Sequence, residues 1–162
     1  MDTYVLDSDA LINLHEHFSG QFNKLRRLAQ NGRLAVPEGV YRELNRTTGK
    51  LFKNLDKWKE RNPSVVVFVR RQPRLASEFT RIEMAYGEKI EVGGKEYNGF
   101  WKSRAGKRAA DGQVVAIGRV HGHIVVSDDR AVGLACMLEN VKCIGWKEFA
   151  RRIGMVKQAQ LF

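Results

Sequence analysis

The sequence has few cysteines, few prolines and no long apolar run, and these features limit the kinds of protein it can be. Its 162 residues contain two cysteines and three prolines, and the longest unbroken apolar run is VVVFV at residues 65–69. A membrane-spanning helix needs about 20 consecutive apolar residues, so we expect no membrane span. The N-terminus has no basic patch followed by an apolar core, so we expect no signal peptide and a cytoplasmic location.

The two cysteines lie in apolar surroundings, Cys136 in LACML and Cys143 in VKCIG. Thiols in such surroundings are usually buried and reduced in cytoplasmic proteins, and we expect both cysteines to be buried and reduced here. No histidine flanks either cysteine at the spacing of metal ligands, so the sequence predicts no zinc site.

Acidic residues are also in short supply relative to basic ones. The chain has 28 Lys and Arg against 18 Asp and Glu, which gives a net charge of +10. Such an excess favours a polyanionic partner, nucleic acid first, although a solvated basic surface is the simpler alternative. The excess is concentrated in two segments without acids, KLRRLAQNGR at residues 24–33 and WKSRAGKR at residues 101–108.

Short apolar runs alternate with helix-like amphipathic segments along the whole chain. This alternation predicts an α/β fold, a three-layer α/β/α sandwich with a central, mostly parallel sheet. We expect one domain over residues 1–162. Residues 87–107 contain five glycines and fit the alternation poorly, so we expect a hairpin or loop inserted there. Strands are predicted at residues 3–7, 33–37, 64–69, 123–127 and 141–145.

Two of the predicted strands run directly into acids. YVLDSDALI places Asp7 and Asp9 after the first strand, and VVSDDRAVG places Asp128 and Asp129 after the fourth. Ligands of open parallel sheets bind beyond the carboxyl ends of the strands, so these acids should meet at one edge.

Two helical acids are placed unusually. Glu43 in VYREL borders the apolar face of its helix, and Asp111 in AADGQVVAIG lies near the buried side. Acids gathered in this way repel one another, and Mg²⁺ or Mn²⁺ would remove that cost through hard oxygen ligands. Taken singly, each has a simpler explanation: helix N-caps for Asp7 and Asp129, a surface ion pair for Glu43 and a first-turn acid for Asp111.

The order of these motifs resembles that of the PIN-domain nucleases, especially the small toxins of the VapC type. YVLDSDALI resembles the family's first-strand pattern, VPEGVYREL its glutamate-bearing helix, AADGQVVAIG its third acidic motif, and VSDD its last. The matched positions are Asp7, Glu43, Asp111, Ser127 and Asp129, with Asp9 and Asp128 as auxiliary ligands.

The resemblance implies a PIN-like sandwich and a metal-dependent endoribonuclease. Asp7, Glu43, Asp111 and Asp129 would hold Mg²⁺ or Mn²⁺, which would activate a water for in-line attack on an RNA phosphodiester. Ser127 would orient an acid or a water. A toxin role further implies an antitoxin protein as partner, and a homodimer is left open.

RNA contacts are expected from the basic segments and from YNGFWKSR. Aromatic faces beside cations are typical of single-stranded RNA sites, and cations hold the phosphate backbone without reading sequence. The alternative is a loop pinned to the core by its aromatic side chains. The candidate RNA-binding residues are Arg26, Arg27, Tyr97, Trp101, Lys102, Arg104, Lys107, Arg108 and Arg130.

Two other functions are consistent with parts of the sequence. DSDALI resembles the first motif of haloacid-dehalogenase-type phosphatases, with Asp7 as nucleophile and Asp9 as acid/base. Leu11 stands where those enzymes have Thr or Val, and Glu43 would have no role. The second alternative is a catalytically silent PIN-like module that binds RNA or protein.

Overall fold

The computed structural model describes residues 1–47, 49–102 and 110–156 and has a five-stranded sheet at its centre. The strand order is β3-β2-β1-β6-β7, and every neighbouring pair is parallel. The predicted α/β fold with a mostly parallel sheet is therefore confirmed. The strands are β1 (Tyr4–Leu6), β2 (Leu34–Pro37), β3 (Val66–Val67), β6 (Ile124–Val126) and β7 (Cys143–Ile144).

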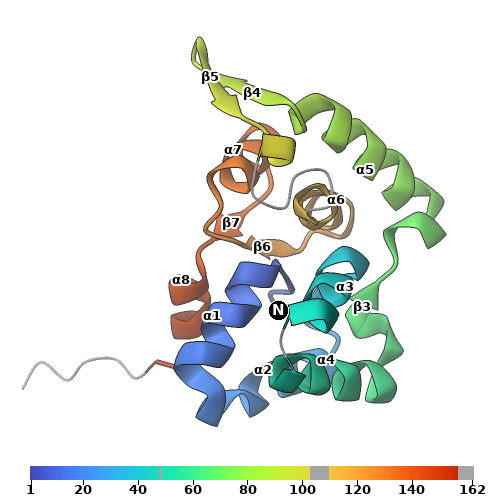
Figure 1. Ribbon diagram of the computed structural model, residues 1–162, viewed down its shortest axis with the longest axis vertical. Coiled ribbons are helices and arrows are strands. Elements are labelled where there is room, and N and C mark those ends of the chain that lie inside the picture. Colours follow the sequence, from blue (N-terminus) through green and yellow to red (C-terminus); the bar gives the residue numbers. More distant parts are fainter. Residues whose placement is uncertain (48, 103–109, 157–162) are drawn as a thin grey trace, which may run out of the picture.

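Helices cover both faces of this sheet and complete a three-layer sandwich (Figure 1). Helices α1, α3, α4 and α8 lie on one side, and α5, α6 and α7 lie on the other. The helices are α1 (Ser8–Phe18), α2 (Asn23–Gln30), α3 (Glu38–Thr47), α4 (Gly49–Arg61), α5 (Pro73–Tyr86), α6 (Asp111–His121), α7 (Arg130–Leu138) and α8 (Trp146–Arg152). In the described parts of the chain the connections also contain short 3-10 turns, η1 (Ser19–Gln21), η2 (Pro63–Val65), η3 (Val69–Arg71) and η4 (Phe100–Lys102).

The central strands are buried on both faces, which explains their unbroken apolar sequences. Val5, Leu6, Val125 and Val126 are fully buried. Strands of parallel sheets covered on both sides read as continuous rather than alternating apolar runs. Among the described residues, no helix combines the length and apolar character needed to cross a bilayer.

The third strand is shorter than predicted. The sequence favoured a strand over residues 64–69, but only Val66 and Val67 pair with β2. This strand is at the edge of the sheet and has a single neighbour. The residues on either side of it turn into η2 and η3, so their apolar side chains fill the core without joining the sheet.

The glycine-rich segment forms an antiparallel hairpin through residue 98. Strand β4 (Lys89–Val92) pairs with β5 (Lys95–Asn98), and Gly93 and Gly94 form the two-residue turn with φ values of 58° and 80°. Positive φ at both central residues is the geometry that favours glycine in tight hairpins. Figure 1 shows the hairpin projecting from the body of the protein above α7.

Both cysteines are free thiols in the structure. Cys136 is buried as expected, whereas Cys143 is only half-buried because β7 is the other edge strand of the sheet.

Candidate active site

The sheet reverses its winding direction between β1 and β6, which are neighbours at its centre. From β1 the chain moves outward through β2 to β3, and from β6 it moves the other way to β7. The crevice beyond the strand ends at such a switch point is the usual ligand site of open α/β sheets. Asp7 follows β1 and Asp129 follows β6, and their charges interact, so the sequence prediction that strand-end acids would share an edge holds for this pair.

Asp7 and Asp129 both cap the helices that follow them. Asp7 Oδ1 accepts a hydrogen bond from the Ala10 N–H at 2.8 Å, and Asp129 Oδ1 accepts one from the Val132 N–H at 3.0 Å. The capping alternative is therefore confirmed for both residues. A cap of this kind engages one carboxylate oxygen, so it is compatible with a second role for the same side chain.

Ser127 connects these two strand-end acids. Its hydroxyl is buried, accepts the backbone N–H of Asp129 at 3.1 Å and also hydrogen bonds to Asp7. The hydroxyl of the last motif thus contacts the carboxylate of Asp7 and the backbone of Asp129, and it can orient the Asp7 carboxylate.

Helix α3 brings Glu43 to the start of α1. The Ser8 hydroxyl donates to Glu43 Oε2 at 2.6 Å. The start of α3 also packs against the start of α6, since the Gly39 N–H donates to Gln113 Oε1 at 2.9 Å. A Cβ on Gly39 would lie only 3.0 Å from that oxygen, so glycine permits the close approach of the two helices.

Asp111 is the first residue of α6, and its environment shows that the acids are close enough to interact. Burial, and after it the charges of Asp129, Asp7, Glu43 and Glu83 in that order of importance, together raise the pKa of Asp111 to about 8. Such a carboxyl group holds its proton near neutral pH unless a cation joins the site.

Asp7 shows the same effect in a milder form. Its pKa is raised to about 6, chiefly by burial and to a smaller extent by the charges of Asp9 and Asp129. Hydrogen bonds from Ser127 and from the Ala10 N–H oppose this rise. A carboxylate that receives such hydrogen bonds and still has a raised pKa is in a poorly solvated position.

Glu83 in α5 is a fifth acid that the sequence analysis missed. A Cβ on Gly112 would lie 2.6 Å from Glu83 Oε1, so the Glu83 carboxylate lies against the first turn of α6. The Trp101 indole N–H donates to Glu83 Oε2 at 2.5 Å. Burial raises the pKa of Glu83, and the Trp101 hydrogen bond lowers it. No local motif marks this residue, because only the packing of α5 on α6 brings it to the site.

The two auxiliary acids are placed less centrally. Asp9 is exposed in the first turn of α1. Asp128 is also exposed, and its Oδ2 accepts the Trp146 N–H at 3.0 Å, so its side chain serves the start of α8. Glu38, the first residue of α3, is buried and paired with Arg42, and its Oε1 has no hydrogen-bond partner among the described residues.

The carboxylate oxygens of these acids suit a hard divalent cation, although the side chains are not arranged as a complete set of metal ligands. Among residues 1–47, 49–102 and 110–156, no three His, Cys, Asp or Glu side chains are grouped closely enough to enclose a metal ion. The carboxylates are instead engaged by Ala10, Ser8 and Val132. Mutually repelling oxygens on four separate elements are nevertheless the ligands that Mg²⁺ and Mn²⁺ prefer.

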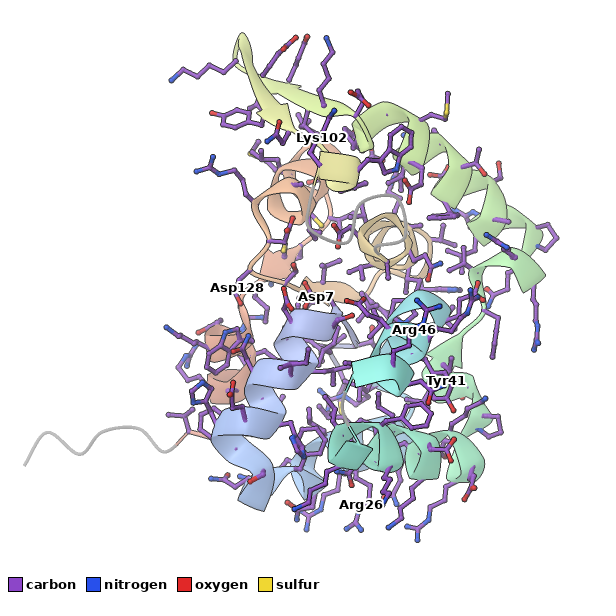
Figure 2. All side chains as sticks on the ribbon, in the orientation of Figure 1. Asp7, Arg26, Tyr41, Arg46, Lys102 and Asp128 are labelled. Atoms are coloured by element: carbon purple, nitrogen blue, oxygen red, sulfur yellow. The ribbon has the colours of Figure 1, made fainter. Side chains whose placement is uncertain are left out.

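The predicted RNA-binding residues separate into three places. Tyr97, Lys102 and Arg130 line a groove of about 370 Å³ that also includes Asp129. Trp101 is anchored through its hydrogen bond to Glu83, as the alternative of a pinned loop expected. Figure 2 shows Arg26 at the lower edge of the molecule, well away from the centrally placed Asp7. Arg27 lines a separate basic pocket with Lys24, Arg33 and Arg152, and the predictions for Arg104, Lys107 and Arg108 lie outside the described residues.

Comparison with known proteins places the chain in a family. A family described as "Domain of unknown function (DUF4411)" matches residues 4–156. The chain belongs to the DUF4411 family. No curated protein matches this DUF4411 chain. Among solved structures, PAE2754 from Pyrobaculum aerophilum is similar, with 15% sequence identity and a TM-score of 0.50 over 96% of this chain and 98% of that one.

Both comparisons extend over nearly the whole chain. The likeness to PAE2754 shows a shared fold. The family match includes both the five acids and the hairpin, so the groove beside Asp129 lies within the DUF4411 domain.

Proposed function

We propose that this protein is a divalent-metal-dependent endonuclease with a PIN-like site that hydrolyses RNA phosphodiester bonds. The observation that carries the proposal is the environment of Asp111. Burial and then the charges of Asp129, Asp7 and Glu43, three acids of the same ordered motif set, raise its pKa at the switch point of a parallel sheet. Acids held together in this way have an electrostatic cost that a divalent cation removes.

Asp7, Glu43, Asp111 and Asp129 are the residues that would hold Mg²⁺ or Mn²⁺. When bound, the metal supplies a Lewis acid that stabilises the charge developing on a phosphate and makes a water nucleophile accessible at neutral pH. Glu83 lies behind Asp111 and acts on it through charge, while Trp101 holds Glu83 in place.

The side chains of the protein do the positioning and move the protons. Ser8 orients Glu43, and Ser127 orients Asp7 while it accepts the backbone N–H of Asp129. Asp111, with a pKa of about 8, must give up its proton when a cation binds. Metal affinity therefore rises with pH up to about pH 8, and binding near neutral pH releases a proton.

The positive charge of the chain supports nucleic acid as the substrate. A net charge of +10 attracts a phosphate backbone, and this attraction weakens steeply as salt increases. The phosphatase alternative gives no role to Glu43 or Asp111, and its acid/base, Asp9, is exposed in α1. The alternative of a catalytically silent binding module gives the clustered acids no role.

The cellular setting is part of the proposal. The free thiols of Cys136 and Cys143 agree with a reducing compartment, and we place the activity in the cytoplasm. The toxin role, the antitoxin partner and a homodimer stay predictions from the family resemblance.

The proposal is tested by incubating purified protein with end-labelled single-stranded RNA in Mg²⁺, Mn²⁺ or EDTA. We expect cleavage that requires metal and is lost in Asp7→Asn and Glu43→Gln. Asp9→Asn is the matched control, because it removes a nearby carboxylate that is exposed, and it should keep most of the activity. Cleavage that survives in Asp7→Asn and Glu43→Gln, or no cleavage by the wild type in either metal, would overturn the proposal.

A further inference from the structure

We propose that the groove between the β4–β5 hairpin and the start of α7 binds one unpaired nucleotide of the RNA, next to the acids. The inference rests on the proposed function for the type of nucleic acid. It adds a site for one base and so requires that the bound region be single-stranded.

The groove has the size and the position for this ligand. It has a volume of about 370 Å³ and is lined by Glu96, Tyr97, Asn98, Gly99, Lys102, Asp129, Arg130 and Ala131. This volume lies in the range of sites for small organic ligands. Asp129 is both a wall of the groove and one of the acids of the proposed site, so a ligand here lies next to the site.

The side chains in the groove offer a flat surface for stacking. The guanidinium carbon of Arg130 lies 5.7 Å from the centre of the Tyr97 ring, within cation–π range. Unpaired bases stack on tyrosine rings and on arginine planes. Glu96 and Asn98 flank Tyr97 in β5 and also line the groove. The Glu96 carboxylate pairs with Lys89 at 2.9 Å, so the Asn98 amide is the polar group that remains for the edge of a base.

The charges in the groove suit the phosphate of the same nucleotide. Among the described residues, no acid forms an ion pair with Arg130, which leaves its guanidinium for a ligand. Lys102 contacts Glu88 at 3.1 Å, and their side chains are 49% and 65% exposed. Ion pairs exposed to this degree contribute little, so a phosphate can compete with Glu88 for Lys102.

Both walls of the groove are held in place by the fold. Ile90 of β4 is buried, and η4 returns the chain from the hairpin with Phe100 buried and the Trp101 N–H bonded to the Gly87 carbonyl at 2.8 Å. The other wall is the first turn of α7, which the Asp129 side chain caps. A groove of this size between fixed walls accommodates one extruded base, whereas a paired base is covered by its neighbours in the stack.

The test is binding of a fluorescein-labelled 12-nucleotide RNA of mixed sequence, measured by anisotropy in EDTA so that cleavage does not interfere. Tyr97→Leu keeps an apolar side chain without an aromatic face, and we expect it to weaken binding about tenfold. Tyr97→Phe keeps the ring and should bind as the wild type does. Arg130→Ala should weaken binding and lower the salt slope of log Kd by about one, because one phosphate contact is lost. Arg74→Ala, an exposed arginine at the start of α5, is the charge-matched control.

The inference is supported if Tyr97→Leu loses affinity for the single strand while Tyr97→Phe and Arg74→Ala do not. It is overturned if Tyr97→Leu binds within twofold of the wild type, or if a duplex of the same sequence binds as tightly and depends equally on Tyr97. In either of those cases the groove is left for another occupant, such as a segment of a partner protein. If the protein cleaves RNA but its binding does not depend on Tyr97, only this inference fails. If binding depends on Tyr97 but no metal-dependent cleavage occurs, only the nuclease proposal fails.

Discussion

Replacing Asp111 by asparagine should stabilise the protein in the absence of metal, although it should abolish activity. Burial and four neighbouring acids raise the pKa of Asp111 from 3.8 to about 8. Asparagine has nearly the same shape as aspartate and no charge. The variant therefore avoids the free-energy cost of protonating Asp111 when the chain folds.

The size of the effect follows from the pKa. At pH 7 Asp111 is ionised in the unfolded chain, where its pKa is 3.8, and protonated in the folded chain, where its pKa is about 8. The pH therefore lies about 3.2 units above the pKa of the unfolded chain. At 1.36 kcal/mol per unit this gap is worth ~4 kcal/mol of unfolding free energy. Asp111 is only partly buried and water screens it, so we expect the variant to gain about 2 to 4 kcal/mol.

The pH dependence gives the sign of the effect. The folded pKa of Asp111 lies above the unfolded one, so its contribution to wild-type stability is fully present below pH 3.8 and is lost as the pH rises through 8. Asp111→Asn should therefore match the wild type near pH 4 and exceed it increasingly up to about pH 8.

The assay is urea unfolding in EDTA at pH 4, 5.5, 7 and 8, with Asp9→Asn as the matched control for loss of an exposed carboxylate. Repeating the series with Mg²⁺ or Mn²⁺ should raise wild-type stability and leave Asp111→Asn unchanged, because a ligand stabilises only the state that binds it. A variant that is less stable than the wild type at pH 7, or a difference that does not change with pH, would refute the electrostatic reasoning.

Three further predictions follow from individual contacts. Ser127→Ala removes a hydrogen bond that lowers the pKa of Asp7, so carboxyl NMR titration should show that pKa rising above about 6, and an unchanged value would contradict the contact. Glu83→Gln removes a charge beside Asp111, so the same titration should show the pKa of Asp111 falling below about 8, whereas a rise would mean that Glu83 does not act through charge. Asp128→Ala removes the side-chain acceptor at the start of α8 and should lower the unfolding free energy by about 1 kcal/mol while metal-dependent cleavage is kept, and loss of cleavage in the folded variant would restore its role as an auxiliary ligand.

Most of the secondary structure was readable from the sequence because it depends on local patterns. Leu51, Leu55 and Trp58 recur at helical spacing, and all three are buried on one face of α4. The error at β3 has a different origin. Residues 64–69 have the apolar pattern of a strand, but a strand also needs a neighbouring strand with which to hydrogen bond. β3 lies at the edge of the sheet, so only the residues that lie beside β2 are paired.

The acids illustrate the same division. Asp7 and Asp129 were recognisable because each follows a buried run directly, and strand ends in parallel sheets share an edge. Glu83 carried no such mark, since α5 joins the site through its packing on Gly112. Asp128 directly precedes Asp129 in sequence, yet its side chain serves α8.

The sequence by itself determined the alternation of strands and helices, the positive charge and the order of the acidic motifs, because each depends on neighbouring residues or on composition. Only the tertiary structure decided the strand order, which puts Asp7 beside Asp129 at the switch point, and the helix contacts that add Glu83. It also decided that the hairpin lies over α7 and makes a groove with Asp129. Those arrangements depend on contacts between residues far apart in the chain, which no local pattern encodes.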